Sequence, residues 1–166
     1  WGEEKAFGVT VDNKGNVYLT GYTDGQLVTQ PEYSRKDAFV RKYNTTGDEL
    51  WTRQFGSNYD DSANSIVVDS LANIYLAGAS GGAFQDYTAS EGVYNFIRKY
   101  GQEGNELWTR QYGHSIFDKN LTLSLDVVNN VYVGGEMLVY WYPGAMDMDA
   151  IIRKYGPLNN ENWSRQ

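Results

Sequence analysis

The sequence predicts an all-β protein made of three repeated four-stranded antiparallel sheets, and three observations carry this prediction. The pattern Arg-Lys-Tyr followed by Glu-Leu-Trp-Thr-Arg-Gln occurs at 41–54 and 98–111, and a partial third copy occupies 153–166. Each copy contains four short runs of strand-forming residues, separated by Gly, Asn, Asp or Ser. A content of 15 % aromatic residues and 18 glycines with only 3 prolines suits short strands joined by tight turns.

The strands of the first copy are expected, in order, at Phe7–Asp12, Val17–Tyr22, Ala38–Tyr43 and Glu49–Phe55. The first two are joined by a turn-rich segment, Asp12 to Asn16, which returns at 69–73 and 126–130. Asp and Asn at the ends of such a turn hydrogen-bond its backbone, so a structural role is expected for them. The third copy departs from the pattern at Asn162, where Leu precedes Trp in the other copies, and we expect a weaker sheet there.

The matched tryptophans Trp51, Trp108 and Trp163 lie 57 and 55 residues apart, a period typical of a propeller, solenoid or array. Apolar residues on both sides of a strand, as in 38–40 and 65–68, indicate sheets covered on both faces. Four antiparallel strands per period then predict the blades of a β-propeller, with the tryptophan as a wedge between blades. The expected blades are approximately 3–56, 57–113 and 114–166, within a single repeat domain.

The whole pattern resembles a known family. Val-Asp-x-x-x-Asn-Val/Ile-Tyr-x-x-Gly, then Asp-Ala-Phe-Val-Arg-Lys-Tyr, then Gly-x-Glu-Leu-Trp-Thr-Arg-Gln-aromatic-Gly is similar to the SBBP family of bacterial and archaeal β-propeller repeats. The resemblance implies a large, often secreted or cell-surface protein, and therefore an extracellular or surface location, without naming a reaction. The Gly-x-Glu-Leu-Trp segment also resembles the docking turn of quinoprotein-type propellers, but no single-copy set of polar residues supports that enzymatic alternative.

Three blades cannot close a ring at normal geometry, so the chain is expected to have partners. Copies of the same chain are one possibility, forming a ring or a head-to-tail filament, and further blades of a longer parent chain are the other. Trp1 and Gly2 would restore the Gln-aromatic-Gly motif after Gln166 of a neighbour. We therefore expect assembly contacts at Trp1, Gly2, Trp163 and Gln166. The chain also lacks an initiator Met, which predicts an upstream segment.

The most variable segments are the expected loops 23–36, 79–93 and 136–148, which strand alternation places on one side of the blades. Only the last is strongly apolar, so it is the candidate surface for a ligand or partner, with the residues Met137, Tyr140, Trp141, Tyr142 and Met146. Aromatic rings with polar tips suit a protein partner or self-assembly first, and a glycan second. Packing of this segment against its own blade is the structural alternative.

Metal binding and catalysis have little support in the sequence. Adjacent Asp60 and Asp61 offer carboxylate oxygens for calcium, but two are too few for a complete site. There is no cysteine, and the one histidine, His114, has no evident catalytic partners, so no cofactor and no enzymatic activity are expected. Three sets of basic residues recur in all copies and are expected to be structural, in inter-blade ion pairs or at solvated edges: Arg41, Arg98 and Arg153, the adjoining Lys42, Lys99 and Lys154, and Arg53, Arg110 and Arg165. The expected partners of the arginines are Asp12, Asp69, Asp126, Glu49 or Glu106.

The charge balance and hydropathy exclude two further classes of partner. A net charge of −7 argues against nucleic acid, because neutralising phosphates requires a basic face. No apolar run reaches the roughly 20 residues that cross a bilayer. A non-enzymatic structural and self-assembling module is the function we predict, with a glycan- or protein-binding propeller as the alternative.

Overall fold

The computed structural model describes residues 2–28, 35–84, 93–112, 121–141, 145–157 and 160–165, and the regular structure in these segments is entirely β. The strand bounds are β1 Glu4–Val11, β2 Val17–Thr23, β3 Asp37–Tyr43, β4 Glu49–Phe55, β5 Asp61–Val68, β6 Ile74–Ser80, β7 Tyr94–Tyr100, β8 Glu106–Tyr112, β9 Thr122–Leu125, β10 Val131–Trp141, β11 Ala145–Tyr155 and β12 Glu161–Arg165.

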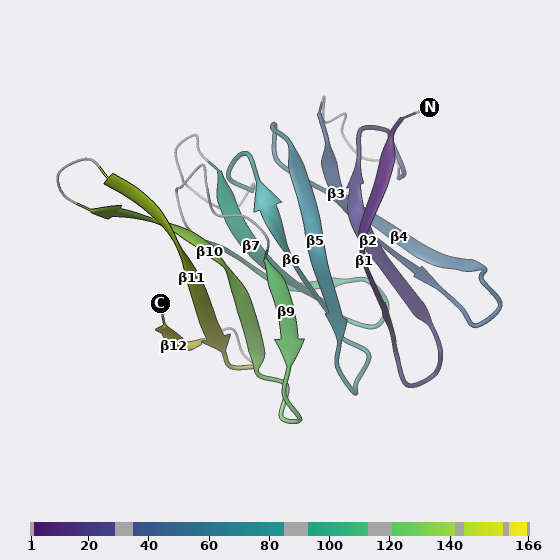
Figure 1. Cartoon of the computed structure of the whole chain (residues 1–166). Helices are drawn as coiled ribbons and strands as arrows, with labels where there is room; N and C mark the ends of the chain where they lie inside the picture. The colour runs from purple at the N-terminus through teal and green to yellow at the C-terminus, as the bar shows by residue number, and fades with distance from the viewer. Residues whose placement is uncertain are drawn as a thin grey trace.

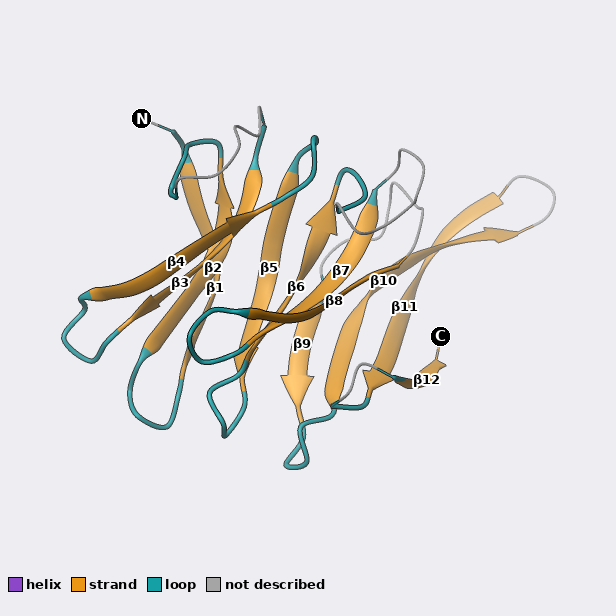
Figure 2. Cartoon of the chain, turned by 180° about the vertical axis from the view of Figure 1, so that it is seen from behind, coloured by secondary structure: helices purple, strands orange, loops and turns teal. Residues whose placement is uncertain are grey.

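Three antiparallel four-stranded sheets form from consecutive strands, in the orders β1-β2-β3-β4, β5-β6-β7-β8 and β9-β10-β11-β12. We call them the first, second and third blade. They stand side by side, with β1, β5 and β9 next to one another (Figure 1), whereas β4 and β8 lie on the opposite edge (Figure 2). The sheets do not close into a ring, so this is part of a larger or oligomeric propeller. The predicted fold class is confirmed.

The sequence repeat is also a repeat of backbone detail. A β-bulge interrupts the pairing of β1 with β2 between Ala6 and Gly8, and the same bulge recurs between Ala63 and Ser65 in the second blade. A second bulge recurs in all three blades, where Lys-Tyr of β3, β7 and β11 faces the last strand of the blade. Its extra residue is Leu50 in the first blade, and it is exposed, so Asn162 at the same exposed place costs the third blade little.

The turn after each innermost strand is held by one carboxylate. Asp12 accepts hydrogen bonds from the backbone N–H of Lys14 and Asn16, both at 2.9 Å, from the Asn16 amide and from the Tyr18 hydroxyl. Asp69 and Asp126 repeat this pattern. These carboxylates therefore do not pair with the recurring arginines, and that alternative for the arginine partners is wrong.

The expected loop 136–148 is wrong in large part, because β10 and β11 remain paired out to Trp141 and Ala145. The two strands form a long hairpin that projects beyond the neighbouring blade (Figure 1). Its segment from Val139 to Trp141 consists of β-branched and aromatic residues, which favour an extended, paired backbone.

Candidate functional site: the joints between blades and the two end faces

Each blade has two faces. The face on the side of the next blade along the chain is here called its following face, and the face on the side of the previous blade its preceding face. The first blade has no preceding neighbour in this chain, and the third has no following one. The first joint brings together the following face of the first blade and the preceding face of the second. The second joint does the same for the second and third blades. Each joint contains one cluster of buried apolar residues, and these two clusters form the core of the protein.

At the first joint, Tyr18, Val40 and Phe55 of the first blade pack with Ile66 and Leu76 of the second. Phe55 makes edge contacts with the rings of two second-blade phenylalanines, Phe84 and Phe96, with ring centroids 6.1 and 5.6 Å apart. At the second joint, the corresponding cluster is Tyr75, Ala77, Ile97, Leu121, Leu123, Val131, Val133 and Tyr155. Burying a side chain of this size contributes roughly 1.5–3 kcal/mol, so the joints carry much of the stability.

A polar latch closes the outer part of the first joint. Three first-blade side chains donate to backbone carbonyls of the turn 101–105, which connects β7 to β8 in the second blade. Lys42 Nζ and Trp51 Nε1 both donate to the carbonyl of Gln102, at 3.1 and 3.3 Å. Arg53 donates to the carbonyls of Gly104 at 2.8 Å and Glu103 at 3.1 Å. The expected wedge is thus a hydrogen-bonded contact between blades for Trp51, whereas Trp108 Nε1 at the second joint is buried with no hydrogen-bond partner among the described residues.

The recurring arginines Arg98 and Arg153 lie on the preceding faces of the second and third blades. The guanidinium of Arg98 lies 4.1 Å from the ring centre of Phe55 across the first joint, and Arg153 lies 4.9 Å from that of Tyr112 across the second. Their ion pairs stay within a blade, Arg98 with Glu106 and Arg153 with Glu161. The expectation of ion pairs between blades is therefore wrong for these residues, since the contacts across the joints are cation–π contacts.

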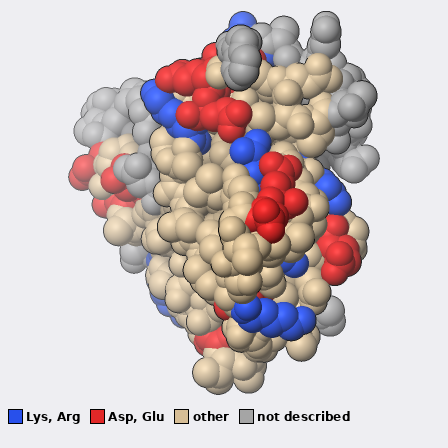
Figure 3. Space-filling view, turned by 90° about the vertical axis from the view of Figure 1, so that its right-hand side faces the viewer, with Lys and Arg blue, Asp and Glu red and all other residues tan. Residues whose placement is uncertain are grey.

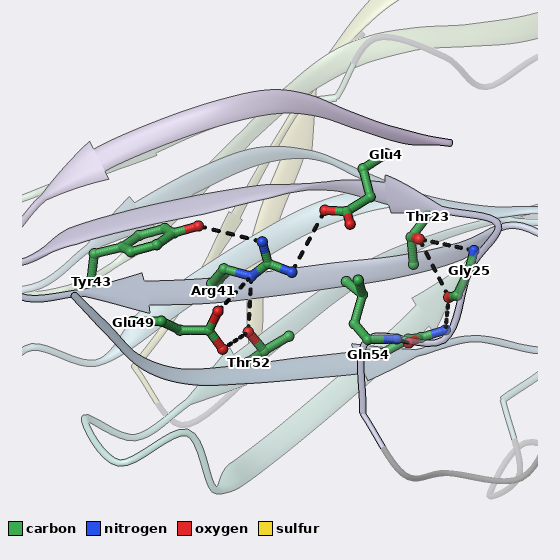
Figure 4. A network of polar contacts seen from close by, with 9 residues as sticks. Glu4, Thr23, Gly25, Arg41, Tyr43, Glu49, Thr52 and Gln54 are labelled. Atoms are coloured by element: carbon green, nitrogen blue, oxygen red, sulfur yellow. Dashed lines mark hydrogen bonds and ion pairs between the residues drawn. The ribbon is translucent and has the colours of Figure 1, made fainter. Parts of the chain in front are cut away.

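Arg41 is the first-blade equivalent, and its polar contacts lie within the first blade (Figure 4). It forms ion pairs with Glu4 at 3.6 Å and Glu49 at 3.4 Å, and donates to the Thr52 hydroxyl at 2.9 Å. On the same blade, Gln54 ties the segment after β2 to the sheet by donating to the Gly25 carbonyl at 3.1 Å. Glu49 and Glu106, both predicted from the sequence, are thus partners of Arg41 and Arg98, whereas Glu4 and Glu161 were not predicted.

Two buried carboxylates converge at the start of the first joint. Asp37 begins β3 and Asp61 begins β5, and a Cβ placed on Gly56 would lie 2.5 Å from Asp37 Oδ1 and 2.6 Å from Asp61 Oδ2. Asp61 accepts a 2.6 Å hydrogen bond from the Ser57 N–H, whereas Asp37 Oδ1 is buried with no hydrogen-bond partner among the described residues. Burial, reinforced by the charge of Asp37, raises the pKa of Asp61 to about 7, and burial also raises the pKa of Asp37.

A hollow of about 410 Å³ opens beside this pair, between the first and second blades. Its walls carry an exposed aromatic ring, Phe7, an exposed carboxylate, Asp60, and the amide of Asn64. The volume lies in the range of small-molecule sites, and Asp61, with its raised pKa, is part of the wall. Such a wall can bind a small ligand by stacking and hydrogen bonding.

The internal repeat reveals which surfaces lack a neighbour. Ile66 and Leu123 sit on preceding faces inside the joints and are 6 % and 8 % exposed, but Val9, their first-blade equivalent, is 65 % exposed. On following faces, Val40 and Ile97 are fully buried, whereas Ile152 of the third blade is 40 % exposed. The preceding face of the first blade and the following face of the third, here called the two end faces, therefore expose residues that the joints bury.

The end face of the first blade is visible from the side in Figure 3. Uncharged side chains cover most of its middle, and lysine, arginine and acidic residues are scattered among and around them. Val9 and Val11 of β1 are both more than half exposed. This surface therefore resembles one half of a joint without the blade that would cover it.

The site residues predicted from the sequence are only partly placed. Trp1, Tyr142 and Gln166 lie outside the described segments. Met137, Tyr140, Trp141 and Met146 belong to β10 and β11, of which the structure describes the backbone but not these side chains. Gly2 lies against Gly25 beside the first blade, and Trp163 packs on Tyr132 of the third blade. These two are on opposite ends of the row of blades, as a head-to-tail contact requires.

Asp60 and Asp61, the predicted calcium ligands, differ in environment. Asp60 is exposed, whereas Asp61 is buried and accepts hydrogen bonds from Ser57. No group of three or more His, Cys, Asp or Glu residues placed to hold a metal occurs within the described ranges. Calcium at these two residues stays a prediction.

Sequence reasoning missed the convergence of Asp37 and Asp61 and the acceptors of the latch. Asp37 and Asp61 are 24 positions apart in the sequence and belong to different strands, so no local spacing relates them. The donors Lys42, Trp51 and Arg53 recur visibly in the sequence, but their acceptors are backbone carbonyls, which leave no mark in it.

Comparisons with known proteins agree with this geometry. A family model described as the SBBP β-propeller repeat matches residues 5–27 and 50–85. No curated protein sequence matches the chain. The crystal structure of a protein of unknown function from Bacteroides caccae has a similar fold, with a TM-score of 0.56 at 10 % identity, and the match covers 98 % of this chain but 46 % of that one. The chain thus spans less than half the length of that protein.

Neither finding indicates a catalytic family. No helix capable of crossing a membrane is present in the part of the chain that the structure describes. The family match, the three matching sequence copies and the three stacked four-stranded sheets lead to one conclusion. The chain is built from β-propeller repeats, and the SBBP repeat model matches them at residues 5–27 and 50–85.

Proposed function

We propose that this chain is a non-enzymatic structural module that assembles head to tail, with the end face of the third blade on the end face of the first blade of another copy. The observation that carries the proposal is the exposure of Val9 and Ile152, whose repeat equivalents are buried in the joints. Contact of these apolar side chains with water costs free energy in proportion to their exposed area. Burial of the equivalent area stabilises the joints.

The two end faces are complementary because they are the two halves of a joint that the chain contains twice. A following face presents Tyr, Lys and β-branched residues, and a preceding face presents Val, Ile or Leu and an arginine. Such a contact is heterologous, so it closes into a ring when the rotation per blade divides the circle and otherwise continues as a filament. Two copies supply six blades, a number within the usual range of propellers.

Further SBBP blades of a longer chain are the alternative occupant of the end faces. The similar fold in the Bacteroides caccae protein, of which this chain spans 46 %, is compatible with that arrangement. Both occupants present the same chemistry, a blade of this family, and they differ only in whether the next blade is covalently connected.

Association of the chain with itself tests the proposal. Sedimentation velocity and light scattering over a range of micromolar concentrations should show a dimer or longer polymers of the 18.8 kDa chain. Val9→Lys should shift the protein toward monomer, because it places a charge in the middle of the end face. Val127→Lys is the matched control, since Val127 is fully exposed in the β9–β10 turn. A wild-type chain that stays monomeric at all concentrations would contradict self-assembly.

Binding of a neutral glycan is the second candidate function, and the hollow between the first and second blades favours it. A pyranose could stack its apolar face on Phe7 while Asp60 and Asn64 hydrogen-bond its hydroxyl groups. Saturation-transfer NMR with a panel of common monosaccharides and their methyl glycosides tests this function. Signals that disappear in Phe7→Ala and Asn64→Ala, but persist in Val127→Lys, would support it, and silence across the panel would contradict it.

A further inference from the structure

The donors of the latch at the first joint recur on the open following face of the third blade. Lys154, Trp163 and Arg165 are the repeat equivalents of Lys42, Trp51 and Arg53. In the first joint, the latter three hold the turn 101–105 through four hydrogen bonds of 2.8 to 3.3 Å.

The third-blade donors are already arranged as in the closed joint. Trp163 meets Tyr132 edge-on with ring centroids 6.3 Å apart, the separation of Trp51 and Tyr18. Lys154 Nζ lies 5.2 Å from the ring centre of Tyr132, compared with 5.3 Å for Lys42 and Tyr18.

Arg165 completes this arrangement. Its guanidinium lies 5.8 Å from the Trp163 ring and donates to the carbonyl of the preceding residue at 2.7 Å. Arg53 does the same, at 5.3 Å from the Trp51 ring and 2.9 Å from the Thr52 carbonyl. Trp163 and Arg165 are therefore preorganised to bind a turn, whereas Lys154 Nζ also lies 3.9 Å from Asp126 Oδ2 and would bind a carbonyl in addition to that carboxylate or in its place.

The matching acceptor is the turn Asn44–Asp48 of the first blade. It has the same backbone pattern as turn 101–105, with Asn44 N–H donating to the Asp48 carbonyl at 2.9 Å and Gly47 at a φ of +86°, compared with +75° for Gly104. A Cβ on Gly104 would meet Trp51 and Arg53 at 3.1 Å, whereas a Cβ on Gly47 would have nothing within 4 Å. The place occupied by the tryptophan and arginine at one turn is open at the other.

We propose that Lys154, Trp163 and Arg165 of one copy bind the backbone carbonyls of residues 45–47 in the next copy, and so latch the head-to-tail joint in one register. This inference rests on the proposed self-assembly and adds its polar contacts. The apolar end faces bring two copies together without fixing their rotation, whereas directed hydrogen bonds to consecutive carbonyls specify a single docking geometry.

Conservative variants test the latch while preserving the fold. Trp163→Phe keeps an aromatic ring on Tyr132 but removes the Nε1–H donor, and Arg165→Met keeps the aliphatic stem but removes the guanidinium. The double variant should weaken association about 10- to 100-fold, because two or three hydrogen bonds to carbonyls are lost. Its unfolding midpoint in dilute, monomeric solution should match that of the wild type.

Arg53→Met is the matched control, because the same substitution inside the first joint should lower the unfolding midpoint and leave association unchanged. The indole ¹⁵N–¹H signal of Trp163, identified by its absence in Trp163→Phe, should move as the wild-type concentration rises. If the double variant associates as the wild type does while Val9→Lys does not, the latch is overturned and self-assembly stands. If the wild-type chain never associates, both are overturned.

Discussion

The pair Ile97 and Ile152 offers a direct measurement of what a covering blade contributes. The two residues have the same identity and the same repeat position, but Ile97 is buried in the second joint and Ile152 lies on the open end face. Replacing isoleucine with alanine removes three carbon atoms, which at about 0.8 kcal/mol per buried carbon is about 2.4 kcal/mol of transfer free energy. The cavity left behind at Ile97 raises the expected loss of stability to about 3–4 kcal/mol.

At Ile152 the same substitution should cost about 1 kcal/mol, because the side chain is 40 % exposed and solvent fills the space that it leaves. Urea denaturation followed by circular dichroism, at a concentration where the chain is monomeric, measures both losses. Equal losses would refute the reasoning, since it would mean that the covering blade does not determine the difference. Repeating the measurement under conditions of association should increase the cost at Ile152 only.

Three further predictions concern the inside of the chain. Because burial raises the pKa of Asp61 to about 7 from 3.8, the folded chain keeps a proton that the unfolded chain loses, so the contribution of Asp61 to the free energy of unfolding should be greatest below about pH 4 and be lost as the pH rises through 7. Urea midpoints between pH 4 and 8.5 should show this decline, and Asp61→Asn should flatten it to the smaller slope left by Asp37; an unchanged slope would contradict the assignment. Gly56→Ala should destabilise the chain by about 1–3 kcal/mol in thermal unfolding, because its Cβ meets two carboxylates, and Gly47→Ala, which has open space but a positive φ, should cost about 1 kcal/mol. Asp69→Ala should lower the stability by about 2–3 kcal/mol, since the N–H groups of the turn and the buried Tyr75 hydroxyl lose their acceptor, and a loss below about 0.5 kcal/mol in urea titration would contradict this role.

The sequence predicts the fold class because the repeat amplifies weak local signals. A single run such as residues 17–22 is an ambiguous strand prediction, but its return at matched positions in all three copies makes chance improbable. The expectation fails at 136–148, where β10 and β11 have 11 residues each, compared with 7 each for β2 and β3, although the sequence between the matched glycine and arginine is no longer than in the other two copies. There the variable sequence suggested a loop, although its β-branched and aromatic residues favour the paired strands that the structure contains.

The candidate site is less predictable because it depends on contacts between blades. The recurrence of Lys42, Trp51 and Arg53 indicated a structural role, and the structure places all three in the latch of the first joint. Their acceptors are main-chain carbonyls, which any residue supplies, so the sequence contains no partner to find. The sequence does not show which face is exposed either. Val9 and Ile66 have the same apolar character and differ only in whether another blade covers them.

Differences among the three copies separate the surfaces that face another blade from those that face water. The third copy replaces the exposed bulge leucine by Asn162, where solvent accepts either residue, but it keeps Lys154, Trp163 and Arg165 on its following face. Trp163 and Arg165 lie on an open surface, and yet their arrangement matches that of the closed joint, including the 6.3 Å separation of the tryptophan from the tyrosine ring. Because the following face of the third blade is built like those of the first two, the same occupant is expected there, namely the preceding face of another blade with its turn presented to the latch.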